Sequence, residues 1–358
     1  MLVNSINLMK IATAMAKNTK KESEYRKIQR FFSKKKDLSG IGIFCLERYV
    51  KEVLKSERKR PYEFYLLIDR VEWVLGQKVH NSLFVTLHDP IRDVSFPIQV
   101  KDLGSKGNSS TENRKEVMDK VVRLLRPMIE SGEIKVTVLG DREFIGEAWE
   151  EYLGLNHFDY ILRLRRNYVL PDGRVLGNEF NGLGVGETRE YRYDGWRVIM
   201  KKLKWCKGRR DDFLAVVTLD MELSSHELLK RFRRRWNIER SFFNLNTNGF
   251  EIKRTRLKEE YKLEMVTYLL MFNYFVYVIL GSMLEEEEGV RRQPKKHGSY
   301  KRESQFLKGL RFVYQILRWP KKILQYMELS RKFDFNLFKT LNVFPDWLDL
   351  KLFQAGVV

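Results

Sequence analysis

The chain has 358 residues, of which 43% are hydrophobic and 32% charged; such a chain can bury a core and is not globally disordered. Lys and Arg number 67 against 47 Asp and Glu, a net charge of +20, which indicates a polyanionic partner such as nucleic acid. Two isolated cysteines, Cys45 and Cys206, exclude a disulfide framework and a structural zinc site.

The first 60 residues predict a basic helical region. Apolar residues recur there at near-helical spacing between clusters of Lys and Arg, so we expect residues 1–60 to bind DNA; an ordinary solvated face is the alternative. The segment lacks the charged start and long apolar core of a secretory signal. Because isolated thiols fit a reducing compartment, we expect a cytoplasmic, nucleoid-associated protein.

The next hundred residues alternate between strand and helix patterns. Strands are expected at 64–68, 83–87, 94–98, 134–139 and 160–164, with helices over 111–127 and 144–153. Thr111 is the expected cap of the first of these helices, and Pro127 disturbs its end. Three strands extended by βα units are the layout of an RNase H-like fold, so we predict an α/β protein with a mixed sheet flanked by helices.

A glycine-rich segment interrupts this layout. The hairpin signal Asp194-Gly195 predicts a β-rich insertion at 170–220, before the helix expected near residue 224. Its expected basic edge consists of Lys201, Lys202, Lys204, Lys207, Arg209 and Arg210. The predicted organisation is a catalytic core at 61–169 and 221–260, the insertion at 170–220, and a helical C-terminal region at 261–358.

Two features of the last third need separate interpretation. A helix is expected from Ser224 or Ser225 to beyond Asn244. Residues 265–284 carry no formal charge and are long enough to span a bilayer, but we interpret them as a buried helix and expect no membrane partner. The polar stretch 285–302 is expected to be a mobile loop.

Asp69 and Asp141 each follow a predicted strand. Those strands are neighbours in an RNase H-like sheet, so the two carboxylates should converge although they are far apart in sequence. Converging carboxylates repel each other unless a cation lies between them, and oxygen ligands suit Mg²⁺ or Mn²⁺. Two such ions can support phosphodiester displacement. Taken singly, each Asp would be interpreted first as a turn or capping residue.

Glu239 is the third candidate acid. Helical spacing places Phe232, Arg235, Trp236, Glu239 and Phe243 on one side. Since the aromatic residues favour burial, we expect them to draw Arg235 and Glu239 toward the protein body. A buried carboxylate needs a partner, which Arg235 and a metal ion would supply.

These residues carry a resemblance to the DDE transposases of the IS4 group of insertion sequences, over about residues 60–280. The matching segments are LLIDR at 66–70 with Trp73, GNSST at 107–111 and LGDREF at 139–144. The family signature of Tyr, Arg, Glu and Lys at fixed spacing is represented by Phe232, Arg235, Glu239 and Asn246. Two positions agree, one keeps the aromatic ring, and Lys is replaced by Asn.

The resemblance implies two divalent ions per active site, Mg²⁺ or Mn²⁺, held by Asp69, Asp141 and Glu239. It also implies cutting and joining of double-stranded DNA, at transposon terminal inverted repeats and a target, by a homodimer. The expected DNA-binding residues are Arg142, Phe232, Arg235, Asn246, Lys253, Arg254, Trp196 and Trp205. Either of the last two would stack on a flipped base, unless both pack inside the sheet.

Two other interpretations stay open. Phe232 and Asn246 are compatible with a catalytically decayed, transposase-derived DNA-binding protein, because an amide offers phosphate only a neutral hydrogen bond. A non-transposing RNase H-like nuclease would carry the same three acids. The five histidines form no ligand cluster in the sequence.

Overall fold

A computed structural model describes residues 6–16, 19–75, 78–104, 106–205, 212–255, 257, 259–288 and 303–318. The chain divides into two units. The sheet unit comprises Ile43–Glu72 and Asn81–Arg240, and the helical unit comprises Met1–Gly42, Trp73–His80 and Ser241–Val358. The three candidate acids all lie in the sheet unit.

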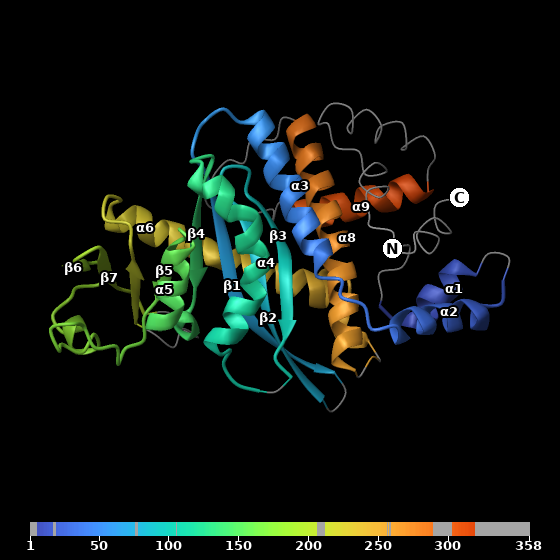
Figure 1. Ribbon diagram of the computed structural model, residues 1–358, viewed down its shortest axis with the longest axis horizontal. Helices are drawn as coiled ribbons and strands as arrows, with labels where there is room; N and C mark the ends of the chain where they lie inside the picture. The colour runs from blue at the N-terminus through green and yellow to red at the C-terminus, as the bar shows by residue number, and fades with distance from the viewer. Residues whose placement is uncertain are drawn as a thin grey trace. The chain divides into compact units, whose positions relative to one another are not determined.

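Among the described residues, eight strands form one mixed sheet (Figure 1). They are β1 (Tyr62–Leu75), β2 (Lys78–Asp89), β3 (Val94–Asp102), β4 (Ile134–Gly140), β5 (Asp159–Arg163), β6 (Thr188–Tyr193), β7 (Trp196–Lys202) and β8 (Phe213–Thr218). Their order is β3-β2-β1-β4-β5-β8-β7-β6. Strands β1, β4 and β5 are parallel, and β8 runs antiparallel to β5. The predicted mixed α/β, RNase H-like sheet is confirmed.

Strand β1 is longer than the sequence suggested. The apolar run at its start is fully buried, as expected for a strand covered on both faces, but the strand continues through Asp69 to Leu75. Its charged residues are tolerated because they have partners: Arg70 lies 2.7 Å from Glu72 and 3.0 Å from Glu143. The pairing of β1 with β4 therefore ends just before Asp69, because the last paired residues are Ile68 on β1 and Gly140 on β4.

The helices beside the sheet follow the expected order but differ from it in detail. They are α3 (Gly40–Ser56), α4 (Thr111–Glu130), α5 (Glu147–Leu155), α6 (Ser225–Phe232) and α7 (Trp236–Phe243). Figure 1 shows α4 and α5 side by side in front of the sheet. The cap of α4 is Ser110 rather than Thr111: its hydroxyl accepts a hydrogen bond from the Asn113 amide. A separate 3-10 turn, Arg142–Phe144, precedes α5.

The single helix expected from residue 224 to beyond 244 is not continuous. Helix α6 ends at Phe232, a 3-10 turn spans Arg233–Arg235, and α7 is followed by a π-helical turn, Asn244–Asn248. A 3-10 turn has three residues per turn instead of 3.6, which rotates all later side chains around the axis. The expected common face is therefore wrong: Trp236 is 58% exposed, and Phe243 is exposed as well.

Strands β6, β7 and β8 of the insertion extend the central sheet. The predicted hairpin is present, with Tyr193 paired to Trp196 across the Asp194-Gly195 turn. Part of the predicted basic edge (Lys207, Arg209, Arg210) lies outside the described residues, as do most of the polar stretch 285–302 and the C-terminal residues 319–358.

The helical unit contains α1 (Leu8–Met15), α2 (Lys21–Ser33), α8 (Glu260–Glu287) and α9 (Gln305–Arg318). Helix α8 is long and apolar enough to cross a membrane, but 89% of its apolar window is buried inside the protein. It packs closely on α9, because a Cβ atom at Gly281 would lie 1.9 Å from the Gln305 carbonyl oxygen. The apolar side chains of α8 are thus packed against other parts of the protein.

Candidate active site

The two aspartates are brought together by the sheet. Ile68 and Gly140 are the last partners of β1 and β4, so Asp69 and Asp141 occupy the next position on two adjacent parallel strands. Each side chain is oriented by the chain that follows it. Asp69 Oδ1 accepts a hydrogen bond from the Arg70 amide at 2.8 Å, and Asp141 Oδ1 accepts one from the Arg142 amide at 2.8 Å.

Gly140 permits this arrangement. A Cβ atom at that position would lie 2.9 Å from Phe144 Cβ and 3.0 Å from Leu162 Cδ2, closer than real Cβ contacts. The glycine therefore allows the turn carrying Asp141 to fold back against β5.

Arg235 links the first acid to the third. Its Nη1 donates to Asp69 Oδ2 at 2.8 Å, and its Nη2 donates to Glu239 Oε1 at 3.1 Å. The arginine is only 5% exposed, and its Nε has no hydrogen-bond partner. The 3-10 turn Arg233–Arg235 ends at this residue, and turns its guanidinium toward β1. Glu239, one turn later on α7, is partly exposed.

The charges of the other two acids act on Asp69. Burial raises the pKa of Asp69 to about 6. Arg235 and the Arg70 amide lower this pKa, whereas the nearby charges of Asp141 and Glu239 raise it further. Asp141 has a cationic neighbour of its own in Arg163, the last residue of β5, at 3.5 Å. A cation shared by the three carboxylates would relieve their repulsion.

The donor chemistry fits a hard divalent cation, since carboxylate oxygens are what Mg²⁺ and Mn²⁺ prefer. Asp69, Asp141 and Glu239 are the residues that would hold it. Across the described part of the chain, however, no three acidic, thiol or imidazole groups already stand in a metal-binding cluster. At the three acids, the Arg235 guanidinium bridges Asp69 and Glu239.

Sequence reasoning missed a polar network behind the aspartates. Glu143 accepts hydrogen bonds from Arg70 and Ser109, and Arg114 binds both Ser109 and the Glu143 carbonyl. The sequence did contain both halves of this network, the GNSST loop and the LGDREF segment, as two polar segments far apart in sequence. Arg163 was missed as well, and its position at the end of a strand next to β4 was the clue.

The remaining predicted DNA-binding residues are distributed over both units. Phe232 is buried and has no polar side-chain atom, so the structure places its ring in the core, at odds with a DNA contact. Asn246 and Lys253 lie in the helical unit; Asn246 is partly exposed and Lys253 exposed. Arg254 ends a 3-10 turn of the same unit, and its side chain lies outside the described set.

The two tryptophans of the insertion differ in exposure. Trp205 is 74% exposed, so its indole is accessible to a base. Trp196 is partly exposed and stacks on Tyr193, with ring centroids 4.4 Å apart. One face of Trp196 is therefore already covered.

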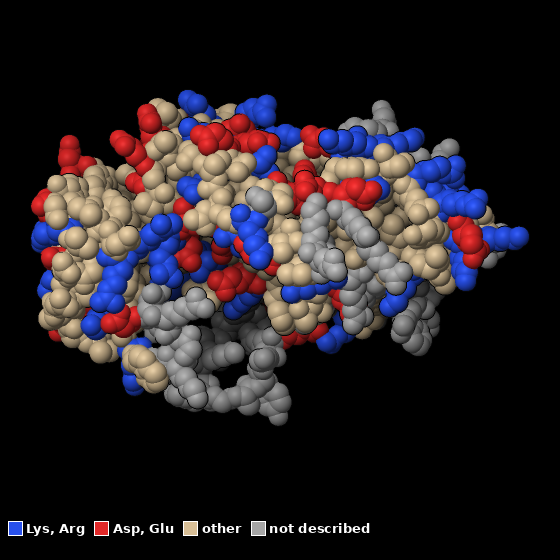
Figure 2. All heavy atoms as spheres, turned by 90° about the horizontal axis from the view of Figure 1, so that it is seen from below, with Lys and Arg blue, Asp and Glu red and all other residues tan. Residues whose placement is uncertain are grey.

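A basic hollow surrounds the exposed Trp236. Its lining includes Lys230, Arg233, Arg234 and Arg240, with one acid, Asp93. Asp93 lies 3.5 Å from Arg234. On the face shown in Figure 2, Lys and Arg side chains are widespread, with acidic side chains between them. The hollow thus combines several cationic side chains with an accessible indole, as protein surfaces that bind single-stranded nucleic acid do.

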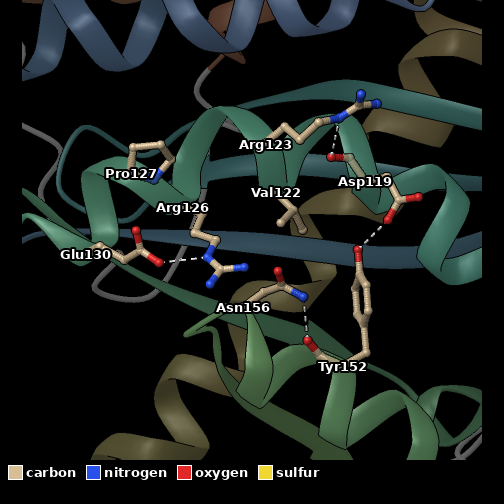
Figure 3. A pocket seen from close by; sticks show the side chains of 8 residues that line it. All are labelled: Asp119, Val122, Arg123, Arg126, Pro127, Glu130, Tyr152 and Asn156. Atoms are coloured by element: carbon tan, nitrogen blue, oxygen red, sulfur yellow. Dashed lines mark hydrogen bonds and ion pairs between the residues drawn. The ribbon is translucent and has the colours of Figure 1, made fainter.

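A second hollow lies between α4 and α5 (Figure 3). Its charged groups satisfy one another: Arg126 lies 2.7 Å from Glu130, and the Tyr152 hydroxyl lies 2.9 Å from Asp119. None of the three candidate acids lines it. We assign it no part in the chemistry.

Residues 106–276 match the protein family described as Transposase DDE domain. The matched segment contains Asp141 and Glu239 and begins after Asp69. A search of curated proteins finds no significant match. A similar solved structure is that of a piggyBac transposase synaptic complex with hairpin DNA, at 10% identity and a TM-score of 0.39. The alignment covers 83% of this chain and 57% of that one, so this chain spans less than two thirds of that transposase.

Proposed function

We propose that the protein is a metal-dependent DDE transposase that cuts and joins DNA at transposon ends, of the IS4 type. The observation that supports the proposal is the placement of the three acids in the sheet unit, where Arg235 joins two of them. Asp69 and Asp141 follow the last paired residues of two parallel strands, and Arg235 joins Asp69 to Glu239. The match of residues 106–276 to a transposase DDE domain supports the same conclusion.

In this proposal Asp69, Asp141 and Glu239 hold two Mg²⁺ or Mn²⁺ ions. When bound, such ions supply activation of a water or 3′-hydroxyl and stabilise the leaving oxygen. Arg235 and Arg163 are the cations nearest the acids, so they would bind the phosphate group at the cleavage point. A guanidinium suits this role because it binds phosphate in a bidentate manner and stays charged.

The proposed substrate is double-stranded DNA carrying terminal inverted repeats, together with a target. The basic hollow at Trp236, the exposed Trp205 and the basic helices α1–α3 are the proposed contact surfaces. Cutting two ends in concert requires two active sites, so we propose a homodimer on DNA, acting at the nucleoid in the cytoplasm.

A strand-cleavage assay tests the proposal. Labelled duplexes bearing a candidate terminal repeat are incubated with Mg²⁺ or Mn²⁺ and with the parent protein, Asp141→Asn or Glu239→Gln. We expect the parent to cut, and both variants to bind DNA without cutting. Binding without scission by the parent under any metal ion would contradict the proposal and favour a catalytically decayed DNA-binding protein.

The same assay separates a transposase from a general nuclease. Unrelated duplex DNA is added as competitor at fixed salt, and products joined to a target plasmid are scored. A transposase cuts the repeat preferentially and yields joined products. Equal cutting of unrelated DNA without joining would favour the non-transposing nuclease.

A further inference from the structure

The side chain of Glu143 is held by two segments that are distant in sequence. Its Oε2 accepts a hydrogen bond from Arg70 Nε at 3.0 Å, and its Oε1 accepts two from Ser109, from the amide and the hydroxyl, each at 2.7 Å. The carboxylate is largely buried, with 13% of the side chain exposed. Both of its oxygens are thus already engaged by donors of the protein.

Ser109 is itself fixed in place. The buried Arg114 on α4 donates to the Ser109 hydroxyl at 3.0 Å, to the Ser109 carbonyl at 2.9 Å and to the Glu143 carbonyl at 2.8 Å. Asn81 on β2 adds two further links, accepting from Arg70 Nη1 at 3.0 Å and donating to the Gly107 carbonyl at 2.9 Å. The loop before α4 is therefore tied to the strand and turn that bear the aspartates.

The network is adjacent to both aspartates. Arg70 directly follows Asp69 and supplies the amide that orients it. Glu143 lies in the 3-10 turn capped by Asp141. The Arg70–Glu143 pair consequently joins the residue after the first acid to the turn of the second, and the geometry of one aspartate is coupled to that of the other.

We propose that Glu143 is a positioning residue, which sets Asp69 and Asp141 at the separation that the divalent cations need. This inference rests on the proposed function and adds to it a residue that touches neither metal ion nor DNA. Groups that orient metal ligands by hydrogen bonding commonly change metal affinity about 10- to 100-fold when they are removed.

Glu143→Gln tests the proposal, with Glu151→Gln as the matched control. Glu151 is an exposed acid on α5, so the control removes the same charge without touching the network. Mn²⁺ affinity is measured by titration calorimetry on the DNA-free protein, and cleavage is measured at saturating DNA. For Glu143→Gln we expect an Mn²⁺ dissociation constant raised about tenfold or more, and a reduced rate that recovers partly at high Mn²⁺. Its DNA affinity should stay within about twofold of the parent.

Ser109→Ala provides a second variant in case Glu143→Gln does not fold. It removes the hydroxyl donor and leaves the carboxylate, so a smaller shift in the same direction is expected. The inference is overturned, with the proposed function intact, by one result. That result is an Mn²⁺ affinity and a DNA cleavage rate equal to those of Glu151→Gln in every network variant that folds. A parent protein that neither binds Mn²⁺ through its aspartates nor cuts DNA would instead overturn the proposed function.

Discussion

Arg235 bridges Asp69 and Glu239, two of the three carboxylates proposed to hold the divalent ions. In that proposal its guanidinium would compete with a divalent ion for the same carboxylates. We predict that Arg235→Gln binds Mn²⁺ about tenfold more tightly, equivalent to about 1.4 kcal/mol, while cleaving DNA more slowly. Titration calorimetry measures the affinity, with Arg126→Gln, from an exposed ion pair, as control. Unchanged or weaker Mn²⁺ binding by Arg235→Gln would show that no such competition exists.

The raised pKa of Asp69 predicts a specific pH dependence of stability. Its folded-state pKa of about 6 lies above the ordinary value of 3.8, so the folded protein holds this proton more tightly than the unfolded chain. Stabilisation from the protonated group is complete below about pH 4 and is lost as pH rises through 6. Relative to Asp69→Asn, the metal-free parent should lose about 2 kcal/mol of unfolding free energy between pH 4 and 7.5.

Urea unfolding of both proteins in the presence of a chelator measures this difference, because their other titrating groups are the same. A gap between parent and variant that does not change with pH would show that Asp69 titrates near its ordinary value.

At the scale of the elements, the sequence predicted the strands, which have a repeating apolar pattern. It did not predict single features such as a 3-10 turn or a contact between distant segments. The apolar runs at the starts of β1 and β4 predicted two buried parallel strands, because apolar residues on both faces leave few alternatives. The three-residue turn at Arg233–Arg235 has no comparable pattern, so Trp236 was expected inside and lies outside. The bonds of Glu143 cross 73 positions to Arg70, and no local period encodes such a contact.

Helix packing provides a prediction for the helical unit. Gly281→Ala would place a methyl group against the backbone of α9, so the two helices must separate; we expect a loss of about 3 kcal/mol. Gly154→Ala on α5 is the control, because nothing lies within 4 Å of its Cβ position. The control should gain about 0.5–1 kcal/mol from helix propensity. Thermal unfolding measures both, and equal effects would contradict the close α8–α9 approach.

The basic hollow at Trp236 gives a prediction about DNA binding. Neither Arg233 nor Arg240 has an ion-pair partner in the described part of the chain, so both cations are available to phosphate. Arg233→Ala and Arg240→Ala should each weaken binding across sequences and lower the slope of log affinity against log salt by about 1. Fluorescence anisotropy at several salt concentrations measures the slope. Arg126→Ala is the control, and a slope as steep as the control's would place the DNA elsewhere.

At the scale of the whole molecule, the net charge of +20 indicates a polyanion without naming the reaction. A basic surface is shared by transposases, nucleases and proteins that only bind DNA. In the proposed function, three acids that hold divalent ions distinguish transposases and nucleases from proteins that only bind DNA. Joined products then distinguish a transposase from a nuclease. The order of the sheet supplies the link, since it brings Asp69 and Asp141 to adjacent strands.

Anomalous diffraction from crystals soaked in MnCl₂ is the most direct measurement of the central claim. The account predicts manganese at about 2.1 Å from carboxylate oxygens of Asp69 and Asp141, with Glu239 completing the site and Arg235 turned away from Asp69. Manganese bound elsewhere, with Arg235 still bridging Asp69 and Glu239 at saturating metal, would contradict it.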